Sequence, residues 1–244
     1  MDAYWDRHAG RSSPELDPAQ LIFAAPLRRA AAGRRVLDCG AGAGSLSACL
    51  APVARRLLAV DASPAMAARA RTFFPDIDYR QADVLTADLG EQFDIICGIA
   101  FLHEIPHPQT PSVIAFLDRH LAPGGFCWFQ ENSFFNPMAR FLRTHVVGRY
   151  GVPQYGSAHE TPFDPERWAL YRAAFRHAER SAEAFVVWER VWTYFIRRGP
   201  DAPWRSLDAL CSHLPDAVKL RTSYIQHIYL SRDVPKREAF EVLF

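Results

Sequence analysis

Three features are missing from this sequence, and each absence argues against a large class of function. There is no run of 18 apolar residues, which argues against a membrane-spanning helix. The first six residues lack the basic and apolar regions of a signal peptide, so we expect a cytoplasmic protein. The 28 basic and 27 acidic residues nearly cancel, and a net charge of +1 argues against nucleic acid as a partner.

Cysteine is scarce, and no C-x-x-C pair occurs. The five cysteines stand singly, mostly inside apolar stretches, at Cys39, Cys49, Cys97, Cys127 and Cys211. This pattern predicts reduced thiols in a core. Because 49% of the residues are hydrophobic and 23% are charged, the chain can bury a sizeable core. We predict one domain over residues 1–244, as a monomer or homodimer, in which residues 240–244 resemble the remnant of a protease-site tag.

Short apolar runs alternate with helical patterns up to residue 132. Strands are predicted at residues 35–39, 57–61, 78–84, 93–100, 126–129, 186–188 and 224–230. Helices are predicted at 18–32, 65–71 and 203–214, and from Thr110 onward, with Ser63 and Thr110 as N-caps before prolines. A turn is expected at 122–125. The expected fold is α/β: a doubly wound, mostly parallel Rossmann-like sheet of about seven strands, with a helical, aromatic-rich insertion after the fifth strand.

Glycines follow the first predicted strand at every second position. The segment from Asp38 to Gly44 reads Asp-Cys-Gly-Ala-Gly-Ala-Gly, and Asp61 ends the next strand. Glycine there allows a ligand to touch the backbone, and a carboxylate at a strand end can accept both hydroxyls of a ribose. The dinucleotide fingerprint G-x-G-x-x-G fails, because serines occupy its last position.

The pattern Asp-x-Gly-x-Gly-x-Gly resembles the first motif of class I S-adenosylmethionine-dependent methyltransferases. The resemblance continues in order through Val60–Met66, Gln81–Val84, Phe93–Ile96 and Leu121–Gly125, so that it covers about residues 30–132. It implies S-adenosylmethionine as the cofactor, with ribose on Asp61 and adenine between Met66 and Asp83. The implied cofactor-binding residues are Tyr4, Asp38, Gly40, Ala41, Gly42, Asp61, Ala62, Met66, Asp83, Val84, Gly98, Ala100 and His103. For Tyr4 the alternative is packing against the sheet edge.

The segment from His103 to His107 matches the zinc-protease letters H-E-x-x-H. That motif needs an α-helix, and Pro106 would break one, so no metal site is predicted. The resemblance instead places His103 beside the cofactor, as a residue that packs around it or as a base.

A general base is needed if the acceptor is a hydroxyl of high pKa, and less so for a neutral amine. The candidates are His103, Glu131, His145, His159 and Tyr155. Residues 133–175 occupy the place where the family inserts acceptor-binding elements, and their aromatic residues suit a lid or a satellite core. Phe135, Tyr150, Tyr155 and Trp168 are the predicted acceptor contacts.

The function expected from the sequence is methyl transfer to an oxygen or nitrogen atom of a small apolar or aromatic metabolite, for example in natural-product biosynthesis. A second hypothesis is a protein on the same scaffold that binds S-adenosylmethionine but catalyses a rearrangement or cyclisation, or has lost transfer. A third, a dinucleotide oxidoreductase, is disfavoured by the glycine spacing.

Overall fold

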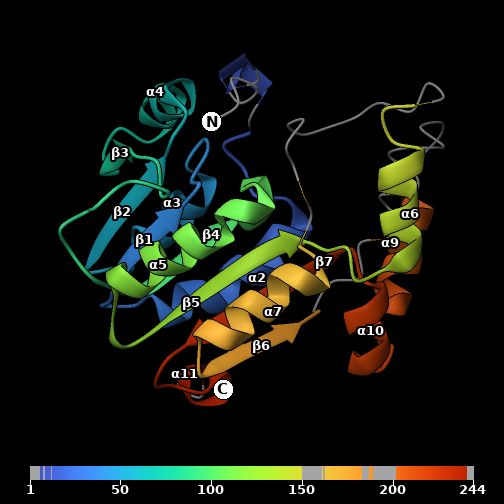
Figure 1. Ribbon diagram of the computed structural model, residues 1–244. Helices are drawn as coiled ribbons and strands as arrows, with labels where there is room; N and C mark the ends of the chain where they lie inside the picture. Colours follow the sequence, from blue (N-terminus) through green and yellow to red (C-terminus); the bar gives the residue numbers. More distant parts are fainter. Residues whose placement is uncertain are drawn as a thin grey trace.

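Seven strands form one sheet in the order β3-β2-β1-β4-β5-β7-β6 (Figure 1). The computed structural model describes residues 6–7, 9–11, 13–149, 161, 163–182, 187–188 and 202–240. The strands are β1 (Arg35–Cys39), β2 (Arg56–Asp61), β3 (Tyr79–Gln81), β4 (Phe93–Ile99), β5 (Leu121–Asn132), β6 (His177–Ser181) and β7 (Ile225–Ser231). Only β7 runs against its neighbours. The predicted doubly wound α/β fold is confirmed.

Helices cover both faces of this sheet, as parallel strands require. The helices of the first half are α2 (Pro18–Ala30), α3 (Ser45–Leu50), α4 (Pro64–Phe73) and α5 (Thr110–His120). The second half adds α6 (Pro137–His145), α7 (Pro165–Ala174), α9 (Ala202–Cys211), α10 (Asp216–Thr222) and α11 (Lys236–Phe240). Short 3₁₀ turns are η1 (Ala9–Arg11), η2 (Leu102–Glu104) and η3 (His107–Gln109). No helix in these described parts is long and apolar enough to cross a membrane.

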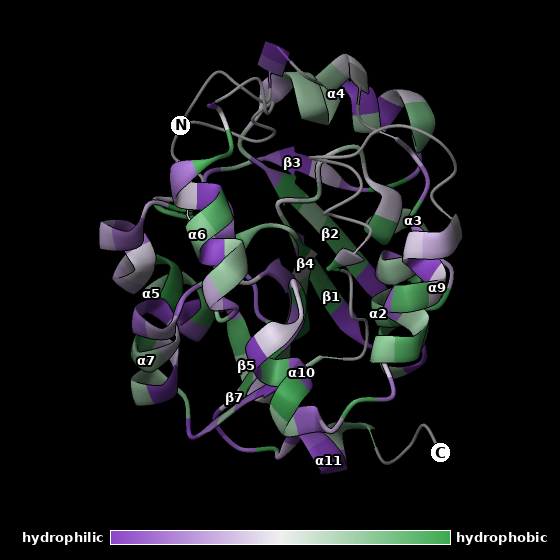
Figure 2. Cartoon of the chain, turned by 90° about the vertical axis from the view of Figure 1, so that its right-hand side faces the viewer, coloured by the Kyte–Doolittle hydropathy of each residue, from purple (hydrophilic) through white to green (hydrophobic). Residues whose placement is uncertain are grey.

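Alternate side chains of the central strands build two separate cores. In β2, Leu58 and Val60 face the core beneath α5 and α7, whereas Leu57 and Ala59 face the core beneath α2, α3 and α4. Figure 2 shows that the central strands are mostly hydrophobic while the surrounding helices carry mixed colours. All five cysteines are free, and Cys39, Cys97 and Cys127 are buried, as the sequence predicts.

Three local predictions are wrong. The sixth strand is His177–Ser181, not 186–188, because a polar edge strand that pairs on one side shows no apolar alternation. The predicted turn at 122–125 lies inside β5, where the pairing with β4 shifts register. Thr110 is the first residue of α5, and Gln109 takes the N-cap position. The Ser63 cap is confirmed, since its Oγ accepts from the Met66 N–H at 3.1 Å.

The strand order places the boundary between β1 and β4 at the centre of the sheet. From β1 the chain winds outward to β2 and β3, then returns to β4 and continues to β5 on the other side. Loops leaving β1 and β4 therefore diverge to opposite faces, which opens a crevice at the carboxyl ends of the strands.

Candidate functional site

A cavity of about 1240 Å³ lies at these carboxyl strand ends. Its wall includes Asp38 and the glycine loop after β1, Asp61 after β2, Asp83 after β3 and Ala100 after β4. Parallel strands end at the same edge of the sheet, so side chains far apart in sequence meet here. The predicted cofactor residues that line the cavity are Asp38, Gly40, Ala41, Gly42, Asp61, Ala62, Met66, Asp83, Val84 and Ala100.

The glycine loop presents bare backbone to this cavity. Gly40 and Gly42 have φ of 66° and 54°, a region that favours glycine. A Cβ on Gly40 would lie 2.6 Å from the Phe101 ring, so this position is filled from behind. A Cβ on Gly42 would meet no atom within 4 Å, although Gly42 lines the cavity. A ligand can therefore occupy the space that a side chain at Gly42 would take.

Asp61 ties the end of β2 to the glycine loop. Its two carboxylate oxygens accept from the backbone N–H groups of Gly42 and Ser63, each at 2.9 Å. Burial raises the pKa of Asp61, while these two backbone donors oppose the rise. The Tyr79 hydroxyl holds the same loop by donating to the Gly42 carbonyl at 2.7 Å. Asp61 is thus oriented, and its remaining lone pairs are available to ligand hydroxyls.

Asp38 is a more deeply buried acid, with only 1% of its surface exposed. Its Oδ2 accepts from the Ser47 hydroxyl at 2.6 Å. Burial raises the pKa of Asp38 to about 7; the Ser47 hydrogen bond lowers it and the charge of Asp61 raises it. Asp38 can therefore change charge near neutral pH, and a cation bound in the cavity would favour its ionised form.

Asp83 and Ala100 complete the rim on either side. Asp83 accepts from the Leu85 N–H through Oδ1 at 3.0 Å, in a turn that projects over the cavity. Ala100 has φ of 57°, the one positive φ of a non-glycine residue in the parts of the chain described. Its N–H donates to the Gln130 carbonyl at 2.8 Å. Backbone strain of this kind concentrates at functional sites, which supports the predicted place of Ala100 beside a ligand.

Gly98 and His103 lie behind the cavity rather than on it. Gly98 is packed inside the sheet, where an added Cβ would lie 2.5 Å from the Cys39 carbonyl oxygen. Only 3% of the His103 surface is exposed, and His103 is not among the lining residues. The resemblance predicts that both residues contact the cofactor, but neither lines the cavity. Ile99, the next residue of β4, lines the cavity, whereas Gly98 is enclosed by Cys39, Phe129 and Phe101.

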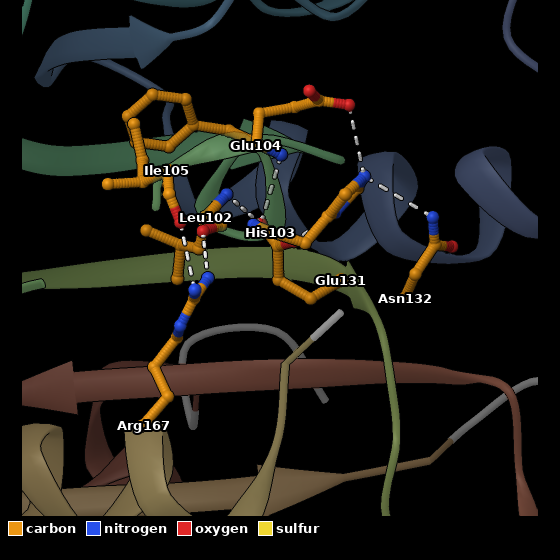
Figure 3. A network of polar contacts seen from close by, with 8 residues as sticks. Leu102, His103, Glu104, Ile105, Glu131, Asn132 and Arg167 are labelled. Carbon is orange, nitrogen blue, oxygen red and sulfur yellow. Dashed lines mark hydrogen bonds and ion pairs between the residues drawn. The ribbon is translucent and has the colours of Figure 1, made fainter. Parts of the chain in front are cut away.

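His103 and Glu131 form a buried polar network (Figure 3). Glu131 Oε2 lies 2.7 Å from His103 Nδ1, and the two Glu131 oxygens also accept from the N–H groups of Phe101, Leu102 and His103. On its other side, His103 Nε2 lies 3.6 Å from Glu104 Oε1 and 3.4 Å from Asn132 Nδ2. Glu131 is thus fully engaged inside the protein, which differs from its predicted place as a base that meets the acceptor.

Arg167 of α7 is a functional candidate that sequence reasoning missed. Its side chain is buried, and its guanidinium donates to the carbonyls of Leu102 at 2.5 Å and Ile105 at 2.8 Å. Figure 3 shows Arg167 and Glu131 reaching the same segment from different elements. In the sequence, Arg167 is an arginine in the first turn of a helix, and such residues are ordinarily exposed. Nothing local to it indicates burial.

The other predicted acceptor and base residues lie elsewhere. His145 ends α6 on an exposed face and stacks on the Phe141 ring at 4.7 Å. Phe135 packs against the core with the Arg180 guanidinium 3.5 Å from its ring centroid. The same guanidinium lies 5.4 Å from the ring centroid of Trp168, which packs against the same core. Their placement favours the satellite-core interpretation over the lid. Tyr4, Tyr150, Tyr155 and His159 lie outside the described residues, as do residues 241–244.

The amino-terminal segment supplies a cavity wall that no motif predicted. Residues Ser13, Glu15, Leu16, Asp17 and Gln20 line it. Asp17 and Gln20 form a capping box at the start of α2, and the Ser45 hydroxyl donates to the Ser13 carbonyl at 2.9 Å. The segment is thereby fixed across the glycine loop. Capping residues were recognisable in the sequence, but their position over the cavity depends on tertiary packing.

The H-E-x-x-H letters do not form the helix that a zinc site would need. Residues 102–104 and 107–109 form two separate 3₁₀ turns with Pro106 between them. His103 faces Glu131, whereas His107 Nε2 lies 4.0 Å from Asp164. The two imidazoles therefore have different partners.

The residues present fit S-adenosylmethionine. The bare backbone at Gly42 leaves room for a ligand, and the lining residues include six carboxylates: Glu15, Asp17, Asp38, Asp61, Asp83 and Glu104. No lysine, arginine or histidine occurs among the described residues that line the cavity. A sulfonium and an ammonium group are favoured by such a field, and carboxylates accept hydrogen bonds from ribose hydroxyls.

Comparisons with known proteins agree with this geometry. Residues 36–125 match the family model described as "Methyltransferase domain". Ubiquinone biosynthesis O-methyltransferase of Pseudomonas entomophila is 31% identical over 146 residues, covering 57% of this chain and 61% of that protein. Trans-aconitate 2-methyltransferase of Methylobacterium nodulans is 38% identical over 130 residues, covering 51% of this chain and 48% of that protein. The chain thus spans about half to three fifths of the length of these curated relatives.

Solved structures show the same fold. The N-methyltransferase NodS from Bradyrhizobium japonicum WM9, in complex with S-adenosyl-L-homocysteine, superposes with a TM-score of 0.55 at 22% identity. That match covers 72% of this chain and 86% of NodS. The predicted fold is confirmed.

Proposed function

We propose that this chain, which carries a methyltransferase domain of the class I S-adenosylmethionine-dependent fold, transfers a methyl group to an oxygen or nitrogen atom of a small metabolite and leaves S-adenosylhomocysteine. The observation that carries the proposal is the single cavity of about 1240 Å³ that joins the glycine loop to the segment around Glu104. Pockets for one drug-sized ligand are roughly 300–1,000 Å³, so this volume suits a cofactor and an acceptor together.

The cofactor supplies an activated methyl group on a sulfonium. The protein's part is then to place the acceptor atom about 3–3.5 Å from that methyl group and in line with the bond that breaks. Leu16, Leu85, Phe101 and Ile105 give the cavity apolar surface that can hold an apolar or aromatic body. The free cysteines support the expected reducing, cytoplasmic setting.

Charge narrows the class of acceptor. The described lining carries carboxylates and no basic side chain, so an anionic acceptor would be repelled. Glu104 is the carboxylate on the wall formed after β4, and 17% of its side chain is exposed. We infer that the acceptor is uncharged or carries an amine, which Glu104 attracts as the ammonium. That ammonium first releases one proton to water, and the lone pair of the resulting neutral amine then attacks the methyl carbon.

The test is a panel of acceptors of matched shape: 2-phenylethylamine, 2-phenylethanol and 3-phenylpropanoate. Purified protein is incubated with S-adenosylmethionine and each compound, and S-adenosylhomocysteine and the methylated product are measured by mass spectrometry. We expect methylated amine or alcohol and no methylated carboxylate. Cofactor consumption with a rearranged, unmethylated product would instead support the alternative chemistry, and transfer to the carboxylate would overturn the charge argument.

A matched pair of variants isolates the role of Glu104. Glu104→Gln removes one negative charge from the cavity lining. Glu166→Gln, the control, removes one negative charge from the exposed face of α7. Glu104→Gln should weaken binding of 2-phenylethylamine to the S-adenosylhomocysteine-loaded protein by about tenfold, the effect expected of a charge-assisted contact. Glu166→Gln should leave it unchanged. Equal affinities in both variants would remove Glu104 from acceptor recognition.

A further inference from the structure

We infer that Arg167 is a positioning residue, which with Glu131 clamps the cavity wall at residues 101–105 and thereby sets where the acceptor meets the cofactor. The inference rests on the proposed function for its catalytic consequence, while the clamp itself is a property of the fold. Neither charged side chain lines the cavity. Both act through the backbone of the segment that does.

The backbone N–H groups of residues 101–103 all donate to Glu131. This carboxylate from β5 accepts from three successive backbone donors, those of Phe101 at 3.1 Å, Leu102 at 2.7 Å and His103 at 3.2 Å. It also contacts the His103 ring, so its capacity as an acceptor is filled. These donors form the start of the 3₁₀ turn η2, where a negative charge is favoured.

The backbone carbonyls of the same segment accept hydrogen bonds from residues of the insertion. Arg167 donates to Leu102 and Ile105, and the N–H of Thr161 donates to the His103 carbonyl at 2.8 Å. The bonding of the segment is therefore divided between the core sheet on one side and the insertion on the other. A short turn satisfied in this way has one defined position.

Two opposite charges are buried at the two sides of this turn. Burial lowers the pKa of Arg167, and the nearby charge of Glu131 counteracts that effect. Only 1% of each residue's surface is exposed. Removing Arg167 takes this donor from the carbonyls of Leu102 and Ile105, and removing Glu131 takes the acceptor from three backbone N–H groups. Either loss is costly because the groups are buried.

The segment held by Arg167 and Glu131 is itself part of the cavity lining. Phe101, Glu104 and Ile105 line the cavity, and the Phe101 ring fills the space behind Gly40 of the glycine loop. The insertion helix α7 is thus linked through Arg167 to the wall that faces the proposed acceptor. A shift of about 1 Å in such a wall is enough to slow transfer roughly 100-fold.

The experiment compares Arg167→Met and Arg167→Lys with Arg172→Met, a control on the exposed face of the same helix. Lysine keeps the charge but can reach only one carbonyl at a time. Three quantities are measured with full-length protein: amide hydrogen exchange in the presence of S-adenosylhomocysteine, affinity for S-adenosylhomocysteine, and kcat and KM with the phenyl compound that the wild type methylates fastest.

For Arg167→Met we expect faster exchange at the amides of Phe101, Leu102 and His103, with no change in β1 and β2. We expect kcat/KM to fall roughly 10- to 100-fold, with partial recovery in Arg167→Lys. Affinity for S-adenosylhomocysteine should change by no more than about twofold, since Asp61 and Asp83 lie on other elements. Arg172→Met should resemble the wild type in all three measurements.

Two results would overturn the clamp. One is unchanged exchange at residues 101–103 in both Arg167 variants. The other is faster exchange throughout the sheet with a matching loss of S-adenosylhomocysteine binding, which would make Arg167 a general stability residue. If the wild type methylates none of the panel, the proposed function fails separately, and the exchange data still decide whether Arg167 holds the wall.

Discussion

At the scale of single residues, Asp38 and Asp61 show how burial and hydrogen bonding act on one residue type at neighbouring strand ends. Asp61 accepts two backbone hydrogen bonds that favour its ionised form. Deeper burial raises the pKa of Asp38 to about 7, although hydrogen bonds from the Ser47 hydroxyl and backbone oppose the rise. Both acids were predictable from the sequence, but the difference between them follows from their surroundings.

The role of Asp61 is tested by Asp61→Ala. Loss of charge-assisted hydrogen bonds to the ribose should weaken cofactor binding by about 1.5–3 kcal/mol, which is roughly 10- to 150-fold. Calorimetric titration with S-adenosylhomocysteine measures this, and Asp76→Ala, at an exposed acid outside the cavity, is the control. Unchanged affinity in a folded Asp61→Ala protein would remove the assignment.

The raised pKa of Asp38 predicts a particular pH dependence of stability. The unfolded chain ionises near its ordinary pKa of 3.8, while the folded chain holds the proton up to about 7. The unfolded state therefore binds fewer protons across that window, so stability falls as pH rises through it. Asp38→Asn should remove this contribution, which is on the order of 4 kcal/mol between pH 4 and pH 7.

Urea unfolding of the cofactor-free protein at several pH values measures this effect. The wild type should lose stability toward neutral pH more steeply than Asp38→Asn. Parallel curves for the two proteins would mean that Asp38 is ionised in the folded state at acid pH, contrary to the expected effect of its burial.

At the scale of elements, short segments carry most of the site. The connection between β5 and α6 is one such short segment, in which Asn136 caps α6 by accepting from the N–H groups of Met138 and Ala139. Asn136 also donates to the Thr222 carbonyl at 2.6 Å, which joins α6 to α10. The glycine loop between β1 and α3 has the same character, since its backbone shape decides what can bind.

The loop's dependence on glycine is tested at Gly40. Gly40→Ala adds a clash with the Phe101 ring to the strain of a positive φ. Gly33 also has a positive φ, of 70°, but a Cβ added there would meet no atom within 4 Å. Gly33→Ala therefore measures the cost of the positive φ without a clash. We expect Gly33→Ala to cost about 1–2 kcal/mol of stability, and Gly40→Ala to cost about 1–3 kcal/mol more.

Chemical denaturation and titration with S-adenosylhomocysteine distinguish these effects. Gly40→Ala should also weaken nucleoside binding, and Phe101→Ala in the same chain should restore part of the lost stability. Equal costs for Gly33→Ala and Gly40→Ala would show that Phe101 moves away freely.

At the scale of the whole molecule, the sheet order brings residues from distant parts of the chain to one cavity. Strand ends supply Asp38, Asp61 and Asp83, the start of α2 supplies Asp17, and the segment after β4 supplies Glu104. Of the described residues of the insertion, Arg167 donates to the carbonyls of Leu102 and Ile105 behind this cavity, whereas Phe135 and Trp168 are not among the residues that line it. Cofactor binding should therefore stabilise the carboxyl edge of the sheet as a unit.

The expected result is a rise in melting temperature with S-adenosylhomocysteine. At 100 times its Kd the ligand adds about 2.7 kcal/mol to stability, which corresponds to roughly 5–10 °C for a domain of this size. NAD at the same concentration should give no shift, because the glycine spacing does not match dinucleotide sites. A larger shift with NAD would contradict the cofactor assignment.

The alternating βα pattern, the glycine loop and the acids at three strand ends were predictable from the sequence alone. These follow from local rules, because hydrophobic periodicity specifies strands and helices, and parallel strands bring their carboxyl ends together. Gly42 and Asp61 could be assigned to the site on that basis, whereas Met66 was assigned from the resemblance to class I methyltransferases. The polar strand β6 could not be found in this way, because only its pairing at the edge of the sheet makes it a strand.

The positions of His103, Glu131 and Arg167 depend on long-range packing and could not be predicted from local patterns. Each is a polar residue of a type normally found at the surface, and its burial depends on partners as many as 65 residues away along the chain. The same is true of Phe135 and Trp168, whose aromatic side chains suit a lid or a core equally well until packing assigns them to the core. A local pattern specifies which element a residue belongs to, whereas its chemical role depends on which buried partners the fold brings to it.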